Sequence, residues 1–433
     1  MMPHCSPAPA AAADAQDAFS PDTLDVLRPR VAGIDVHKMQ VTATVRLCDP
    51  GCRQPQCATR EFSALPGGLR AMAGWALSHG VTAAAMEGTG IFWKAPYEAL
   101  ENAGIEVELF HAQHVRQIKG RKTDRNDSIW LARVCQYGLA TPSYVPPQPF
   151  RDLRRTSHCR RTLTGDRSRV RNRIHKALDH CGLRLGGALS DILGLNGRRI
   201  LKGLVAGRTA AEILPTLSGH VRGKLELLER VLEARPDSYT LWRLSDLLQR
   251  FEELDRSIAD TDELLSLSLA PWEDQLRLLE TVPGIDRGSA CAILIELGPE
   301  VGAFPSAKHL AAWAGVAPGN HKSAGKRLSR RTRKGNPALK TTLVECALGA
   351  ARTHCTQFHS YHKAGGRYKQ ATMATAHKML RIIYAMLRDG RPYQDSEVDY
   401  ERLLVQRNAP RWLRKLKQYG FLDQPAAPAA AVA

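Results

Sequence analysis

The chain has 433 residues, and 43% of them are hydrophobic, which is enough apolar material for two or three packed domains. Lysine and arginine outnumber aspartate and glutamate by 61 to 43, for a formal net charge of +18. No apolar run reaches the ~20 residues of a membrane-spanning helix, and the N-terminal stretch lacks the pattern of a signal peptide. We therefore expect a cytoplasmic protein without a membrane segment, and the charge predicts a polyanionic partner, most commonly nucleic acid.

The first part of the chain predicts a disordered tail followed by a small sheet. Residues 1–28 are rich in Ala, Pro and Asp, a composition that is typical of disorder. Alternating apolar residues then predict strands near 31–38, 41–46 and 59–64, which form an antiparallel meander. Asp35 lies inside the first of these strands.

Helices and strands alternate after the meander. The apolar run 81–86 predicts a buried parallel strand that ends in Glu87 and a glycine turn. Helices are predicted near 67–79 and 92–103, and a further strand covers 106–110. Three antiparallel strands followed by alternating helices and strands predict an α/β domain with the ribonuclease H-like layout.

This predicted domain spans residues 29–145, and two aspartates open its last predicted helix. Asp124 and Asp127 stand three residues apart, so both carboxylates project from one helix face. Two like charges this close repel unless a cation lies between them, and Mg²⁺ is the usual ion with oxygen ligands. The alternative is a helix cap with a solvated face, because aspartate also suits a helix start. Asp35 and Glu87 favour the metal site, because strands can deliver both acids to the same point.

A Pro-rich linker at 144–149 precedes a basic helical and coiled-coil region at 150–268. Between Arg151 and His180 there are ten Lys and Arg against three Asp. This one-sided charge favours phosphate contact over an ordinary solvated face. The arginines expected to bind nucleic acid in this region are Arg154, Arg155, Arg160, Arg161, Arg169 and Arg173.

A short heptad seam lies at the end of this region. Apolar or neutral residues recur in steps of four and three from Leu247 to Leu265, with charged residues outside the seam. The pattern predicts either a coiled-coil dimer or an intramolecular helical hairpin.

The third predicted domain, 272–395, is mainly helical, and a C-terminal extension with an Ala/Pro tail follows at 396–433. The stretch 279–298 resembles a helix-hairpin-helix element, whose Pro-Gly turn exposes N–H groups to phosphate, although an ordinary αα-hairpin fits equally well. Between Glu300 and Glu345 there are nine Lys and Arg and no acid. The cations of this tract expected to bind nucleic acid are Lys322, Lys326, Arg327, Arg330, Arg331, Arg333 and Lys334.

Ser323 lies within this basic tract, in a glycine-flanked turn between lysines. Its hydroxyl could bind a phosphate, complete a turn, or act as a nucleophile. Local chemistry favours the turn residue, because no base partner is visible nearby.

Six segments together resemble a known family. Residues 33–38, 86–90 and 122–127 resemble the N-terminal RuvC-like domain of the DEDD insertion-sequence transposases. Residues 282–285, 314–318 and 322–326 look like the C-terminal transposase domain of the same family. Its members are relatives of the Piv and MooV DNA invertases and are described as bridge-RNA-guided recombinases.

The resemblance implies a bacterial transposase that cuts and rejoins DNA strands. Asp35, Glu87, Asp124 and Asp127 would be the catalytic carboxylates that bind Mg²⁺, and Ser323 the nucleophile that forms a covalent link to DNA. The implied partners are donor and target DNA, a guide RNA encoded by the element, and further copies of the chain, as a dimer or a tetramer of two dimers. The alternative is a metal-dependent RuvC-like nuclease or resolvase, in which the carboxylates activate water and Ser323 has no catalytic role.

Overall fold

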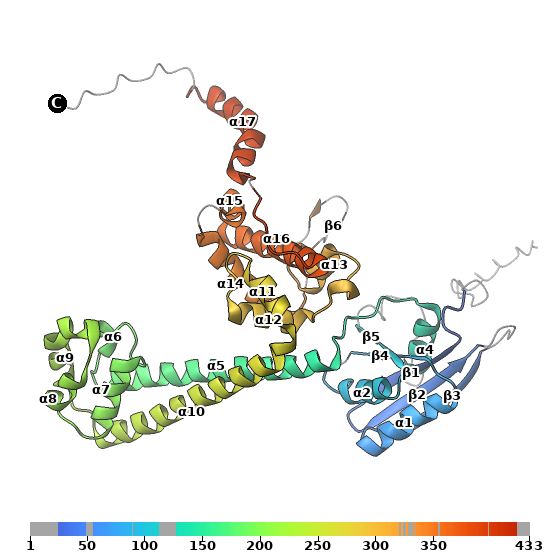
Figure 1. Cartoon of the computed structure of the whole chain (residues 1–433), viewed down its shortest axis with the longest axis horizontal. Helices are drawn as coiled ribbons and strands as arrows, with labels where there is room; N and C mark the ends of the chain where they lie inside the picture. The colour runs from blue at the N-terminus through green and yellow to red at the C-terminus, as the bar shows by residue number, and fades with distance from the viewer. Residues whose placement is uncertain are drawn as a thin grey trace, which may run out of the picture. The chain divides into compact units, whose positions relative to one another are not determined.

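The chain folds into two compact units, Met1–Val145 and Pro146–Ala433, each with its own core (Figure 1). Asp124 lies outside the residues that the structure describes. Within the described part, no helix is both long and apolar enough to cross a bilayer. The structure, a computed structural model, describes residues 25–48, 55–88, 90–111, 127–319, 332, 334–353, 356–396 and 398–421, and the backbone alone of 322, 323, 326 and 327.

The first unit is built on a five-stranded mixed sheet in the order β3-β2-β1-β4-β5 (Figure 1). The first three strands pair antiparallel, and β4 is parallel to both β1 and β5. This confirms the predicted meander followed by parallel strands. The strands are β1 Arg30–Val36, β2 Gln40–Leu47, β3 Gln56–Ser63, β4 Ala83–Glu87 and β5 Glu106–Phe110.

Different helices cover the two faces of the sheet. Helices α1 (Pro66–Ser78) and α2 (Lys94–Asn102) pack on the face that carries Ile34 and Met86. Helix α4 (Asp127–Tyr137) packs on the other face, against Val31, Ala83 and Ala85. Because side chains alternate between faces along a strand, odd-numbered residues of β1 and β4 point to the α4 side.

Gly33 lets α4 approach β1 unusually closely. A Cβ atom built on Gly33 would lie 1.9 Å from the carbonyl oxygen of Ser128 and 2.3 Å from the amide nitrogen of Ala132. Both are backbone atoms of α4, so no side-chain rotation can relieve the clash. Beside this contact the Thr44 and Ser128 hydroxyls hydrogen-bond at 2.7 Å in the interior.

We predict that Gly33→Ala destabilises the first unit by more than about 3 kcal/mol, because α4 must move away from the sheet. The matched control is Gly74→Ala in α1, where an added Cβ meets nothing within 4 Å. That change should stabilise the helix by about 0.5–1 kcal/mol. Urea unfolding of both variants tests the prediction, and equal midpoints would show that α4 does not pack closely on Gly33.

The tail predicted at 1–28 ends earlier than expected. The amide groups of Leu27 and Arg28 both donate hydrogen bonds to the carbonyl oxygen of Gln136. The Arg28 guanidinium also lies 2.7 Å from Glu108 of β5. These contacts hold the chain from Leu27 onward against the first unit, and composition alone could not reveal them.

The second unit begins with two long helices that lie side by side, α5 (Gln148–His180) and α10 (Ser238–Leu269) (Figure 1). Phe251, Ile258 and Leu265 of the predicted seam are buried. Of the two alternatives for this seam, the structure shows the intramolecular hairpin. The elements between the long helices share a core with them and are α6 Leu185–Ala188, α7 Leu195–Val205, α8 Ala210–Ile213, η3 Leu214–Thr216, η4 Gly219–Lys224 and α9 Leu225–Leu232.

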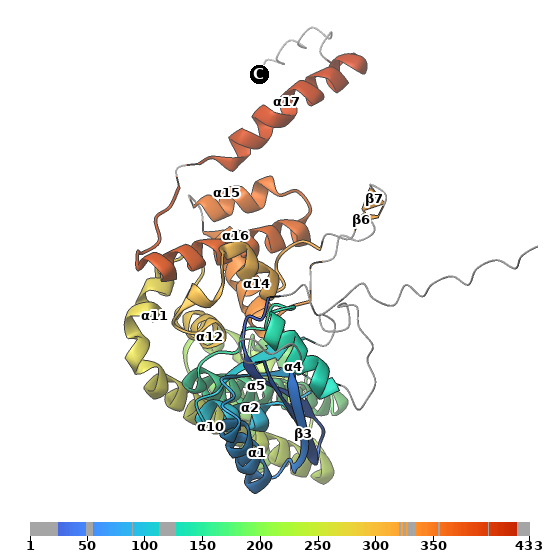
Figure 2. The same cartoon turned by 90° about the vertical axis from the view of Figure 1, so that its right-hand side faces the viewer.

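The rest of the second unit is mainly helical, as predicted (Figure 2). Its only strands among the described residues are β6 (Lys322–Ser323) and β7 (Lys326–Arg327), which pair antiparallel. Its helices are η5 Ala270–Trp272, α11 Glu273–Glu280, α12 Arg287–Leu297, η6 Val301–Ala303, α13 Ala307–Trp313, α14 Pro337–Arg352, α15 Gln357–Ala364, α16 Tyr368–Asp389 and α17 Tyr400–Gln418.

Candidate functional site

Two of the predicted carboxylates lie on neighbouring strands, on the face that α4 covers. Ile34 of β1 is the register partner of Met86 of β4, so Asp35 and Glu87 are the next residues along two parallel strands. Both are odd-numbered and point to the α4 side. Asp127 is the first residue of α4. The strand register and the close packing at Gly33 therefore bring three acids from distant parts of the sequence to one end of the sheet.

The electrostatics of Asp35 show that these acids influence one another. Burial raises the pKa of Asp35, and the negative charges of Asp127 and Glu87 raise it further. His37 opposes this effect, because its Nε2 lies 3.2 Å from Asp35 Oδ2. Sequence reasoning assigned no role to His37, although it lies two residues after Asp35, where the β1–β2 turn brings it back to the carboxylate.

The donor set suits a hard divalent cation, since carboxylate oxygens that repel one another are stabilised by a cation between them. Within the described residues, no three His, Cys, Asp or Glu side chains lie close enough together to ligate an ion as they stand. The fourth predicted ligand, Asp124, falls outside those residues. The assignment of the tetrad as metal ligands stays a prediction.

Ser323 lies on a short hairpin whose base is fixed to the second unit. Its register partner is Lys326 on β7. At the base, Pro318 forms a β-bridge with Thr332, and the Lys340 ammonium donates a 2.7 Å hydrogen bond to the Thr332 hydroxyl. The backbone positions of Lys322, Lys326 and Arg327 share the hairpin and Lys334 is exposed, whereas Arg330, Arg331 and Arg333 lie outside the described residues.

A buried carboxylate, Glu296 of α12, connects this hairpin base to the basic helix α5. It is 3% exposed and accepts a 2.7 Å hydrogen bond from the amide of Asn336, the residue that caps α14. From α5, Arg154 Nε lies 3.4 Å and His158 Nε2 3.1 Å from its oxygens. Sequence reasoning missed this cluster, because a single glutamate in an apolar helix gives no sign of partners that lie far away in the chain.

We predict that Glu296→Ala lowers the free energy of unfolding of the second unit by about 3 kcal/mol, at the lower end of the range for a broken buried ion pair. The value is not higher because His158 is 56% exposed and regains water. Glu300→Ala is the control, since Glu300 is exposed and makes no capping hydrogen bond. A urea midpoint for Glu296→Ala equal to that of Glu300→Ala would contradict the prediction.

The arginines of α5 expected to bind nucleic acid are largely engaged in ion pairs. Arg154 and Arg161 pair with Glu296, Arg160 with Asp262 of α10, and Arg155 and Arg169 with aspartates of α5 itself. Within the described residues, Arg173 has no acidic partner. Exposed pairs contribute only about 0–1 kcal/mol, so Arg155 and Arg169 can exchange a carboxylate for a phosphate at small cost. Arg154 is 19% exposed and fits a structural role better.

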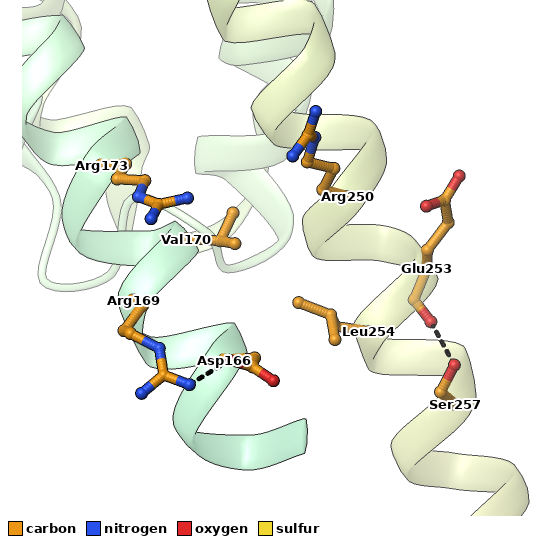
Figure 3. A pocket seen from close by; sticks show the side chains of 8 residues that line it. All are labelled: Asp166, Arg169, Val170, Arg173, Arg250, Glu253, Leu254 and Ser257. Carbon is orange, nitrogen blue, oxygen red and sulfur yellow. Dashed lines mark hydrogen bonds and ion pairs between the residues drawn. The ribbon is translucent and has the colours of Figure 1, made fainter. Parts of the chain in front are cut away.

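Arg173 lies in a groove of about 410 Å³ between α5 and α10 (Figure 3). Arg250 of α10 faces it across this groove, and Arg169 lies one turn away. Arg250 is also held by Asp246, 3.0 Å from its Nε. Asp166 and Glu253 also line the groove, and Asp166 pairs with Arg169. Arg173, which has no acidic partner among the described residues, is therefore the cation of this groove that is most consistent with the predicted phosphate contact on α5.

The hairpin predicted at 279–298 forms from α11 and α12. An added Cβ at Gly284, in its turn, would lie 2.5 Å from backbone atoms of α14, so the turn packs tightly on that helix. Asp286 accepts the amide hydrogen of Ser289, and Asp286 and Glu345 line the adjacent pocket. Two acids at the turn repel phosphate, which favours the ordinary αα-hairpin of the two alternatives.

Comparison with known proteins places these features in a family. A model described as a DEDD transposase domain matches residues 32–182, and one described as the Transposase IS116/IS110/IS902 family matches residues 276–363. Together they match more than half of the chain. The DEDD transposase domain implies the use of a divalent metal ion.

Three relatives show the same likeness. The pilin gene-inverting protein of Moraxella bovis is 32% identical over 123 residues, 27% of this chain and 38% of that protein. An insertion element IS110 protein of Streptomyces coelicolor is 31% identical over 122 residues, 27% of this chain and 30% of that protein. A protein described as a probable family 20 transposase of Pseudomonas aeruginosa is 25% identical over 320 residues, 69% of this chain and 81% of that protein. The first two alignments therefore span well under half of each relative's length.

The mixed sheet, with acids at the ends of β1 and β4 and at the start of α4, defines a ribonuclease H-like domain of the DEDD class. This domain precedes a mainly helical C-terminal domain in the same chain. The chain belongs to the IS110/IS116/IS902 family of transposases.

Proposed function

We propose that this protein is the transposase of a bacterial insertion sequence, which cuts and rejoins DNA strands with Mg²⁺ and a serine nucleophile. The observation that carries the proposal is the convergence of Asp35, Glu87 and Asp127 at one end of the sheet. Family membership supports it, and Asp124, three residues before Asp127, supplies the fourth carboxylate of the tetrad.

The proposed chemistry assigns separate tasks to the two domains. Asp35, Glu87, Asp124 and Asp127 would hold Mg²⁺, which would offset the negative charge that develops on the phosphate oxygens. The Ser323 hydroxyl gives up its proton to solvent as its oxygen attacks phosphorus. The bond from phosphorus to the leaving strand breaks, and that strand takes up a proton from solvent and departs as a hydroxyl. Lys322, Lys326 and Arg327 lie on the same hairpin and hold the phosphate.

Strand joining is the reverse of this reaction. A hydroxyl at the end of another strand attacks the phosphoserine ester, the serine–phosphorus bond breaks, and a new phosphodiester forms. Because one ester replaces another at each step, the reaction requires no external energy source. The same carboxylates could instead activate water, as in a RuvC-like nuclease without a covalent intermediate, and that alternative predicts cleavage without any protein–DNA adduct.

We further propose that a structured RNA encoded by the element guides the choice of donor and target DNA, and that the active form is a dimer or a tetramer of two dimers. The net charge of +18 and the arginine groove of α5 and α10 support a nucleic-acid partner besides the cut strands. The oligomer rests on the family resemblance.

Recombination with purified components tests the function. Protein, a donor plasmid with the element, a target plasmid, Mg²⁺ and the non-coding RNA should together yield donor–target junctions that sequencing detects. Omission of the RNA or of Mg²⁺ should abolish the junctions. Equal yield with an unrelated RNA of the same length would remove the guide role, and nicked DNA without junctions would favour the nuclease.

A further inference from the structure

Among the described residues, the side-chain contacts that attach the C-terminal helix α17 to α15 and α16 lie near its start. The Tyr361 and Tyr400 rings meet edge to face at 5.1 Å, and Lys378 donates a 2.6 Å hydrogen bond to the Tyr400 hydroxyl. Lys363 pairs with Glu401 at 3.0 Å. No residue of α17 is buried, and the helix runs away from α15 and α16 in both views (Figures 1 and 2). The anchored first turn therefore presents the rest of the helix to its surroundings.

This exposed helix carries a strong and unpaired positive charge. It contains six Lys and Arg and one acid, Glu401. At 100° per residue, Arg407, Arg411, Arg414 and Lys415 project from one side of the helix, and we call these four residues the α17 stripe. A rise of about 1.5 Å per residue spreads them over about 12 Å. Among the described residues, none of the four has an ion-pair partner.

The α17 stripe thus differs from the arginines of α5. Most of those guanidinium groups are already neutralised by aspartates or by Glu296, so their contribution to nucleic-acid binding requires an exchange of partners. The charges of the stripe need no such exchange. Cations gathered on one side of an exposed helix are complementary to the row of phosphates along a nucleic-acid backbone, although Pro410 lies inside the helix between Arg407 and Arg411.

We propose that α17 is a further nucleic-acid-binding element of this protein, which contacts the phosphate backbone of duplex DNA through the α17 stripe. Duplex DNA is the occupant that fits, because membership in a family of transposases supplies a DNA substrate and the stripe supplies the complementary charge. Both family matches end before α17, since the second stops at residue 363. The inference deepens the proposed function and rests on it only for the choice of DNA.

Replacement of the four stripe residues by glutamine in the full chain tests the inference. Binding to a fluorescent duplex from the element end is measured by anisotropy at several salt concentrations. We expect affinity to fall about tenfold or more near physiological salt, and the slope of log K against log salt to decrease by about three to four. Because α17 buries no residue, the melting temperature should not change.

Two matched variants separate the effect of the stripe from the effects of net charge and of the apolar side of α17. Arg184, Arg208, Arg235 and Lys308 changed together to glutamine remove the same charge from exposed positions elsewhere, and this variant should bind duplex DNA like the wild type. An equal loss in both variants would mean that only net charge matters and would overturn the inference. Trp412→Ser with Leu416→Ser alters the opposite, apolar side of α17; if this variant loses DNA binding and the stripe variant does not, the inference is also overturned.

Further measurements test whether duplex DNA is the ligand of α17. A greater loss for a structured RNA than for duplex DNA, or weaker binding to anionic phosphatidylserine vesicles with DNA binding unchanged, would overturn the choice of DNA. Strand joining is measured in parallel. Stripe-dependent DNA binding by a wild-type protein that joins no strands would refute the proposed function and leave the inference intact.

Discussion

Ser323→Ala is expected to bind element DNA and RNA with wild-type affinity and to lose strand joining by more than about 10⁴-fold, as for removal of an essential nucleophile. No neighbouring group can take over the covalent bond to phosphorus. We expect the variant to keep the fold, because the β-bridge between Pro318 and Thr332 anchors the base of the hairpin. Gel shift and junction sequencing measure the two quantities on one preparation.

Ser329→Ala and Thr332→Ala are the matched controls, since both hydroxyls lie in the same basic tract. Thr332 accepts the hydrogen bond from Lys340, so its loss should cost about 0.5–1.5 kcal/mol of stability and leave strand joining within about tenfold of the wild type. Full strand joining by Ser323→Ala would show that another residue is the nucleophile. Loss of strand joining in Ser329→Ala or Thr332→Ala alone would point to that residue instead.

Asp35→Asn, Glu87→Gln, Asp124→Asn and Asp127→Asn are each expected to reduce strand cleavage by at least about 10³-fold. Loss of one carboxylate weakens metal binding and removes several kcal/mol of charge stabilisation in the transition state. Glu61→Gln, on the exposed edge strand β3, should cleave like the wild type. Wild-type cleavage in any of the four variants would remove that residue from the tetrad.

The melting temperature of Asp35→Asn tests the repulsion among these acids without a measurement of activity. Burial and the charges of Asp127 and Glu87 disfavour the ionised form of Asp35 in the folded chain. With chelator at neutral pH, Asp35→Asn should therefore melt a few degrees higher than the wild type. Added Mg²⁺ should stabilise the wild type more than the variant. A lower melting temperature in chelator would mean that the acids do not repel one another.

The first unit could be predicted because its determinants are local. The alternation of apolar and polar residues predicted the strands of the meander. An apolar run that ends in an acid predicted that Glu87 would lie at the end of a buried strand. The face of the sheet that carries Asp35 and Glu87 follows from the odd-numbered positions that α4 covers. The close packing of α4 on β1 could not be predicted, because the need for glycine at position 33 arises only from its contact with the backbone of Ser128 and Ala132.

The partners of α5 could not be predicted for a related reason. A count of charges in a window from Arg151 to His180 indicates a free basic surface, but three of the acids that pair with its arginines, Asp255, Asp262 and Glu296, lie about 90–140 positions later. The heptad seam was ambiguous in the same way. Its partner is α5 in the same chain, and a periodic pattern does not show whether its partner is in the same copy or another.

The most direct test of the proposed chemistry is the identity of the residue joined to DNA. Wild-type protein is incubated with Mg²⁺, the element's RNA and a nicked suicide substrate, and the trapped adduct is digested and sequenced by mass spectrometry. We expect one adduct, on the peptide that contains Ser323, and we expect it to be absent from Asp35→Asn and from reactions with chelator. An adduct on any other residue, or cleaved DNA without an adduct, would contradict it.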